Sequence, residues 1–94
     1  MNLQRLRGAA RDLREPVFHD LAPIRVDGCP VAVALSVRVD EAGMWRGRLQ
    51  FADQVTGTER ATAEIFCAVS EQDLWQSVDG MREHHLRDLY RSLD

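Results

Sequence analysis

The sequence has no lysine, and all 12 of its basic residues are arginine. Either the composition is biased, or guanidinium groups are used to bind carboxylate or phosphate through two parallel hydrogen bonds, which lysine does less well. The chain has 15 acidic residues and a net charge of −3. The molecule as a whole therefore has no general attraction for nucleic acid or anionic lipid.

Long apolar runs are also missing. The longest uncharged apolar run covers residues 29–35, which is too short to cross a bilayer. Residues 1–14 carry Arg5, Arg7 and Arg11 within their apolar pattern and so lack the core of a signal peptide. These two features predict a cytoplasmic protein that does not bind membranes.

Cysteine is too scarce for a disulfide framework. The chain has 2 cysteines, Cys29 and Cys67, which suit a reducing compartment. The expected strand directions place them at opposite ends of a sheet, so we expect neither a disulfide nor a shared metal site. Cys67 is expected to be a small buried side chain. We expect no cofactor.

Motifs that mark common enzyme classes are absent as well. The sequence contains no nucleophile elbow, phosphate loop, paired-histidine metalloprotease motif or dinucleotide fingerprint. We therefore expect no enzyme. Its 94 residues, 45% of them hydrophobic and 29% charged, are ordinary for a single globular domain over residues 1–94.

Helical spacing of apolar residues occurs at both ends of the chain. Residues 1–15 carry a 3-4-3 leucine and alanine stripe that ends before Pro16, which predicts an N-terminal helix. Residues 70–93 repeat apolar side chains at the same spacing, and Ser70 three positions before Asp73 is typical of a helix start. One long C-terminal helix over 70–93 is therefore predicted.

Alternating apolar residues between these segments predict an antiparallel sheet over residues 17–68. Odd-numbered residues of 31–40 and 44–52 share one face, with Val39 opposite Trp45 and a three-residue loop that ends at Gly43. Asp27-Gly28 predicts a hairpin, and Pro23 restricts residues 17–26 to an edge strand. The predicted fold class is α+β, a two-layer arrangement of a three- to four-stranded meander covered on one face by the long helix.

A fourth strand over residues 58–67 is expected to keep the same odd-numbered inner face. Gly47, Ala61 and Ala63 would then form a strip of small residues in the middle of the inner face, on which Trp75 is expected to pack. This register gives the pairs Leu49–Ala61, Gly47–Ala63, Trp45–Ile65 and Arg46–Glu64.

The outer face of this sheet is the candidate partner surface. Arg38 and Arg46 fall opposite one another, and such like-charge pairs are unfavourable unless negative charge is supplied nearby. An aromatic side chain at the end of an edge strand invites another chain. The candidate partner-binding residues are Arg38, Arg46, Arg48, Arg60, Glu64 and Phe66.

Two further residues are candidates for buried charge. Arg82 lies near the middle of the apolar arc of the expected C-terminal helix, with His85 on the same side. Arg82 either extends its head group to solvent or awaits a carboxylate or phosphate from a partner.

These features favour a non-catalytic protein-interaction module, a homodimer that uses the outer sheet face and the edge of the fourth strand. The alternative is nucleic-acid binding through arginines of the sheet and of the first helix, which would weaken steeply with salt. A third option is a small ligand held between helix and sheet near Trp45, Trp75 and Arg82.

Overall fold

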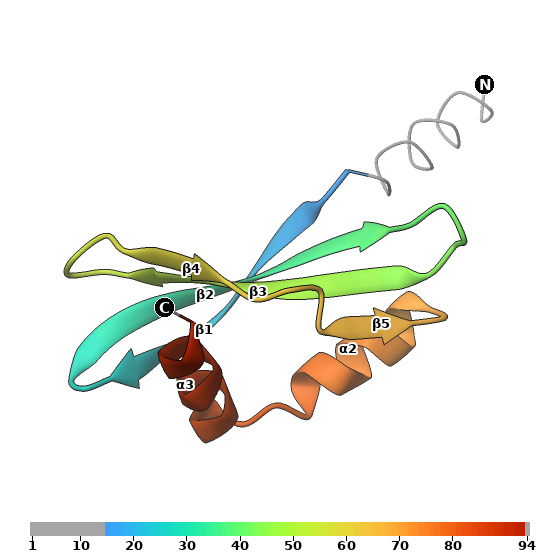
Figure 1. Ribbon diagram of the computed structural model, residues 1–94. Helices are drawn as coiled ribbons and strands as arrows, with labels where there is room; N and C mark the ends of the chain where they lie inside the picture. The colour runs from blue at the N-terminus through green and yellow to red at the C-terminus, as the bar shows by residue number, and fades with distance from the viewer. Residues whose placement is uncertain (1–14, 94) are drawn as a thin grey trace.

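A computed structural model describes residues 15–93, in which five strands precede two helices (Figure 1). The chain is α+β with an antiparallel sheet, although several details of the predicted fold are wrong. The strands are β1 (Val17–Val26), β2 (Cys29–Val39), β3 (Trp45–Asp53), β4 (Glu59–Ala61) and β5 (Phe66–Ala68), and the helices are α2 (Glu71–Asp79) and α3 (Glu83–Ser92).

The first three strands pair as the alternation predicts. Val39 lies opposite Trp45 and the whole β2–β3 register follows from that pair. Asp27 and Gly28 both have positive φ, 53° and 81°, as a tight two-residue hairpin requires. Gly43, at φ 83°, takes the left-handed position at the end of the β2–β3 loop. β1 is an edge strand, because the sheet order is β1-β2-β3-β4 with β5 pairing only with β3.

The odd-numbered side chains of β2 and β3 form the inner face of the sheet. Both helices pack on this face, which lies below the sheet in Figure 1. The buried apolar residues of this core are Ile24, Val26, Val31, Val33, Leu35, Val37, Leu49, Phe51, Phe66, Leu74, Val78 and Tyr90.

The predicted fourth strand is wrong. Its place is taken by two three-residue strands that lie along β3 in different registers, with Ala61 opposite Gln50 and Phe66 opposite Gly47. The break begins at the buried Thr62, whose Oγ1 accepts a hydrogen bond from Leu49 N at 3.0 Å while its own N–H donates to Leu49 O at 2.9 Å. A side chain therefore replaces one backbone partner in the ladder, and the register shifts by two residues between β4 and β5, while even-numbered residues face inward in both.

The single long C-terminal helix is also wrong. Ser70 does cap α2, since its Oγ accepts a hydrogen bond from Asp73 N at 3.2 Å. The helix ends at Gly80, a residue that is about 1 kcal/mol less favourable than alanine in a helix interior. The break allows α2 to contact β3 and β5 while α3 contacts β1, so the two helices cover different parts of a twisted sheet.

The predicted N-terminal helix over residues 1–15 lies outside the described residues except for Glu15, which is not helical. The first helix in the part of the chain that the structure describes begins at Glu71. No helix within residues 15–93 is both long enough and apolar enough to cross a membrane.

Candidate functional site

The outer face of the sheet has no helix on it within residues 15–93 (Figure 1). Even-numbered residues of β2 and β3 point to this side, and many of them are small. Ser36 is nevertheless only 5% exposed, because it lies between Phe18 on β1 and Arg48 on β3 in the strand register. Side chains of the outer face therefore shield one another from solvent, although no helix covers them.

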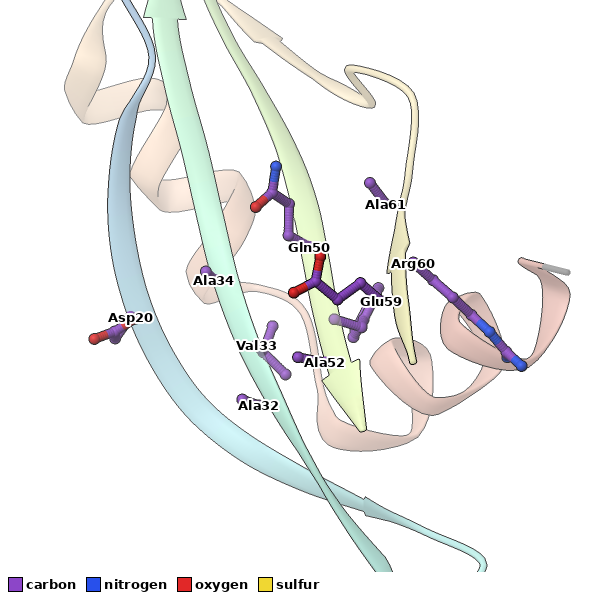
Figure 2. A pocket seen from close by; sticks show the side chains of 10 residues that line it. Asp20, Ala32, Val33, Ala34, Gln50, Ala52, Glu59, Arg60 and Ala61 are labelled. Carbon is purple, nitrogen blue, oxygen red and sulfur yellow. The ribbon is translucent and has the colours of Figure 1, made fainter. Parts of the chain in front are cut away.

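One end of this face is a shallow hollow of about 290 Å³. Its floor consists of short side chains, Ala32 and Ala34 of β2 and Ala52 of β3. Figure 2 shows these alanines between the carboxylates of Asp20 on β1 and Glu59 on β4. Both carboxylates belong to exposed residues. This end of the outer face is thus apolar in the middle and negative at its rim.

The other end carries the arginines that the sequence predicts to lie opposite one another, Arg38 and Arg46. Each has its own carboxylate. Glu64 receives two hydrogen bonds from Arg38, Nε to Oε2 at 2.6 Å and Nη2 to Oε1 at 2.8 Å. Asp40 Oδ2 accepts from Arg46 Nε at 2.8 Å. The repulsion between the two arginines is therefore offset within the chain, and the predicted Arg46–Glu64 pair is wrong.

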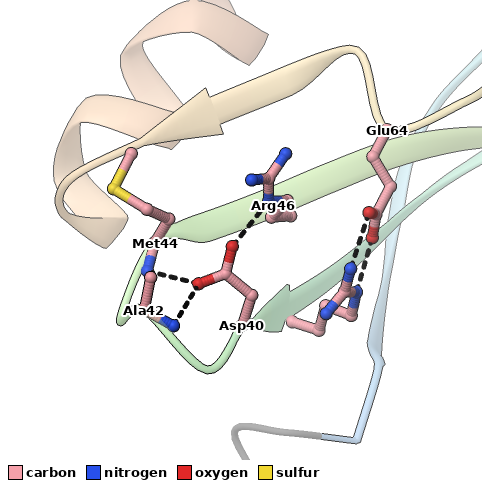
Figure 3. Close-up of polar contacts among 6 residues, drawn as sticks. Asp40, Ala42, Met44, Arg46 and Glu64 are labelled. Carbon is pink, nitrogen blue, oxygen red and sulfur yellow. Dashed lines mark hydrogen bonds and ion pairs between the residues drawn. The ribbon is translucent and has the colours of Figure 1, made fainter.

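Asp40 also orders the turn between β2 and β3 (Figure 3). Its Oδ1 accepts hydrogen bonds from the backbone N–H groups of Ala42 and Met44, both at 2.9 Å. The hydrogen bond from Arg46 and those from the turn hold the pKa of the Asp40 carboxyl below its usual value. The Arg38 hydrogen bonds lower the pKa of Glu64 in the same way.

These carboxylates predict a loss of stability in acid. Because the pKa of Asp40 is lower in the folded chain than in the unfolded one, its contribution is complete above about pH 5 and is lost as the pH falls through the folded pKa. Asp40→Asn is expected to flatten the fall of the unfolding free energy between about pH 5 and pH 2, measured by urea unfolding. Arg46→Gln, which removes the main partner of the carboxylate, should reduce the same slope. An unchanged slope in both variants would contradict this assignment.

Arg48 is exposed and makes no ion pair or side-chain hydrogen bond with any residue in the range 15–93. Arg60, also predicted on the outer face, belongs instead to the inner face. Its guanidinium lies 4.5 Å from the centre of the Tyr90 ring and donates to Tyr90 O at 3.1 Å. The slip in register at β4 explains this error, since Arg60 is paired with the inward-facing Phe51.

The aromatic residue of the outer face is Phe18 and not Phe66. Phe66 is 7% exposed and lies in the core, whereas Phe18 is 58% exposed. Sequence reasoning missed Phe18 because the inward-facing Ile24 and Val26 imply that even-numbered residues of this strand point inward. An irregularity between Leu21 and Ile24 reverses the parity and turns Phe18 outward.

The buried-charge candidates Arg82 and His85 are both exposed, which agrees with the alternative in which Arg82 extends its head group to solvent. Arg82 is the residue before α3, where its backbone N–H donates to His85 Nδ1 at 3.0 Å. The helix break at Gly80 removes Arg82 from the apolar arc that an unbroken helix would have presented to the sheet. Because Arg82 is exposed, its guanidinium does not require a carboxylate or phosphate from a partner.

The third predicted site, between helix and sheet, is only partly assembled. Trp75 packs edge to face on His19 with ring centres 5.1 Å apart, and Trp45 lines a nearby hollow of about 130 Å³. Arg82 lies at the start of α3 and does not line this hollow. The volume is well below the roughly 300–1,000 Å³ of typical ligand sites.

The remaining groups with chemical potential lie apart from one another. Among residues 15–93, no three histidine, cysteine or acidic side chains gather as a metal site would require. Both cysteines are free. Cys67, predicted to be buried, is exposed on β5 because the strand has the opposite parity from the one expected.

Comparisons of this chain with protein-family models, curated proteins and solved structures find no match.

Proposed function

We propose that this protein is a non-catalytic protein-interaction module that self-associates through the outer face of its sheet. The observation that carries the proposal is an exposed aromatic side chain, Phe18, beside an alanine-floored hollow on a sheet face without a helix. An antiparallel sheet normally keeps a solvated face polar, and exposed apolar groups gathered on one face mark interaction sites. Sheet faces commonly pack against each other at about 10 Å.

The edges of the sheet are less suitable for self-association than its outer face, and this includes the edge of the fourth strand. β4 and β5 have three residues each and are separated by residues 62–65. At the other edge, β1 contains Pro23 and the irregularity between Leu21 and Ile24. Short strands, proline and bulges are the features that prevent pairing of sheet edges.

Nucleic acid fits this face less well than a protein does. Arg38 and Arg46 are already paired with carboxylates of the same chain. The charged residues of the outer face, four arginines against four acids, are Arg25, Arg38, Arg46, Arg48, Asp20, Asp40, Glu59 and Glu64. This balance provides no basic surface for a phosphate backbone.

Light scattering after size-exclusion chromatography, at protein concentrations from low micromolar to millimolar, tests the proposal. The mass is expected to rise from 10.7 kDa towards twice that value. Phe18→Ser is expected to weaken association at least about tenfold, since burying an aromatic anchor contributes more than roughly 1.4 kcal/mol at an interface.

Ile65→Ser is the matched control. Ile65 is also exposed, at 46%, but it lines a groove between α2 and α3 on the other side of the sheet. Its replacement should leave the mass unchanged. A monomer at every concentration would reject the proposal, and so would a dimer that is weakened by Ile65→Ser and not by Phe18→Ser. Binding of a labelled oligonucleotide that weakens steeply with salt would favour nucleic acid instead.

A further inference from the structure

The outer face is polarised along its strands. Residues paired across neighbouring strands form a row, and at one end of the face Arg48 and Phe18 belong to the same row because both are paired with Ser36 of β2. Four residues further along β3, Ala52 lies opposite Glu59. One end of the face thus presents a positive charge and an aromatic side chain, and the other an alanine floor with a negative rim.

The charges that mark these two ends are available to a partner. Arg38 and Arg46 are engaged with Glu64 and Asp40, as described above. Within residues 15–93, by contrast, Arg48 and Glu59 are exposed and neither makes an ion pair or a side-chain hydrogen bond. An unpaired cation at one end and an unpaired anion at the other are complementary only if a second face is laid on the first in the reverse direction.

We infer that two copies pack outer face to outer face about a two-fold axis that reverses the strand direction, with Arg48 of each copy against Glu59 of the other. This inference rests on the proposed self-association. A symmetric dimer uses the same patch twice, so each contact occurs in duplicate. The reversal lays β3 on β3 of the second copy and places Arg48 over Ala52, whose neighbour across the sheet is Glu59.

The same arrangement gives Phe18 a place to bind. Reversal of the rows moves it from the level of Ser36 to the level of Ala32, over β1 of the second copy and one strand from Ala32 of the alanine floor. A large side chain then lies against the edge of a hollow lined by small ones. The Asp20 carboxylates of the two copies approach each other at the exposed rim, where a like-charge contact costs little.

The other simple two-fold axis is unfavourable. An axis parallel to the strands would keep every row at its own level and lay β2 of one copy on β3 of the other. Arg38 would then face Arg46, and the Phe18 side chain would miss the alanine floor. The charge pattern therefore selects the reversed arrangement, in which packed sheets remain within about 30° of parallel alignment.

The size of the face suits a modest dimer. β1, β2 and β3, about 4.8 Å apart and roughly 30–35 Å long, present about 500 Å² to a partner, and the three-residue β4 adds about 50 Å². Standard interfaces bury roughly 600–1,000 Å² on each side. Self-association should accordingly be visible within the concentration range of the scattering experiment.

Charge reversal tests the arrangement. Arg48→Glu alone sets two carboxylates against each other at both contacts, and Glu59→Arg alone does the same with two guanidinium groups. Each variant is expected to self-associate at least about tenfold more weakly than the wild type. An equimolar mixture of the two should associate within a few-fold of the wild-type affinity, because both contacts of the mixed pair are then of opposite charge. Native mass spectrometry distinguishes mixed pairs from self pairs by mass.

A mixture of Arg48→Glu with Glu41→Arg is the control. Glu41 lies in the turn between β2 and β3, outside the hollow, so Glu41→Arg alone should self-associate like the wild type, and its mixture with Arg48→Glu should contain far fewer mixed pairs than the mixture of Arg48→Glu with Glu59→Arg. Circular dichroism should show that every variant is folded. Wild-type dimers that are insensitive to both single reversals, or single reversals that the mixture does not rescue, would overturn this arrangement and leave self-association intact. A wild-type monomer would instead reject the proposed function itself.

Discussion

Replacement of Phe66 by alanine is expected to lower the free energy of unfolding by about 3–5 kcal/mol, the usual cost of deleting a buried phenyl group. Phe66 is 7% exposed, and its Cβ lies 3.5 Å from the position that a Cβ on Gly47 would occupy. The cavity left behind would lie between the sheet and α2, where the backbone of β3 is fixed by its neighbours. A loss of this size is a large part of the roughly 5–15 kcal/mol that stabilises a typical domain.

Ile65→Ala is the matched comparison for Phe66→Ala. The preceding residue is 46% exposed, so its truncation should cost at most about 1 kcal/mol. Urea unfolding followed by circular dichroism measures both variants. The odd-numbered inner face inferred from the sequence requires the opposite order. If Ile65→Ala proved the more damaging change, the register of β5 described here would be wrong.

Leu74→Ala is expected to cost about 2–5 kcal/mol. Leu74 is fully buried on α2, and its Cδ1 lies 3.5 Å from the position of a Cβ on Gly47. A Cβ at Gly47 would be in ordinary van der Waals contact with Leu74, so the Leu74 side chain packs directly against β3 at this point. Leu74 therefore fixes the distance between the two layers.

Thermal unfolding gives an independent measure of the Leu74→Ala effect. Each kcal/mol corresponds to roughly 4–8 °C in Tm for a domain of this size. Gln76→Ala on the same helix is exposed and should change the stability by at most about 0.5 kcal/mol. Similar melting temperatures for Leu74→Ala and Gln76→Ala would show that α2 does not dock on β3 through Leu74.

Some of the arginines in this lysine-free chain use the guanidinium geometry, and composition bias alone does not account for them. Arg38 holds Glu64 with two parallel hydrogen bonds, the geometry that lysine does not provide. Arg60 combines a stacked position over Tyr90 with a hydrogen bond to a backbone carbonyl. Several arginines thus bind groups within the chain. Among residues 15–93, Arg25 and Arg48 are outer-face arginines without a carboxylate partner, and Arg25 donates a hydrogen bond to Gly28 O.

The candidate site was only partly accessible from the sequence. The opposition of Arg38 and Arg46 followed from alternation alone, because β2 and β3 are long and strongly patterned. The identity of their carboxylate partners did not follow, since Glu64 lies in a segment between two strands. Phe18 was hidden by a bulge, which leaves no fixed signature in the alternation of apolar residues.

The sequence by itself determined the antiparallel pairing of the first three strands, the two tight turns and the start of α2 at Ser70. These features depend on neighbours close in sequence or on long runs with a two-residue period, where a slip of one residue would bury arginines. Only the tertiary structure decided the division of the fourth strand and of the C-terminal helix. Thr62 ends regular pairing by accepting a hydrogen bond from Leu49, and the helix ends at Gly80, after which α2 and α3 pack on different strands of a twisted sheet.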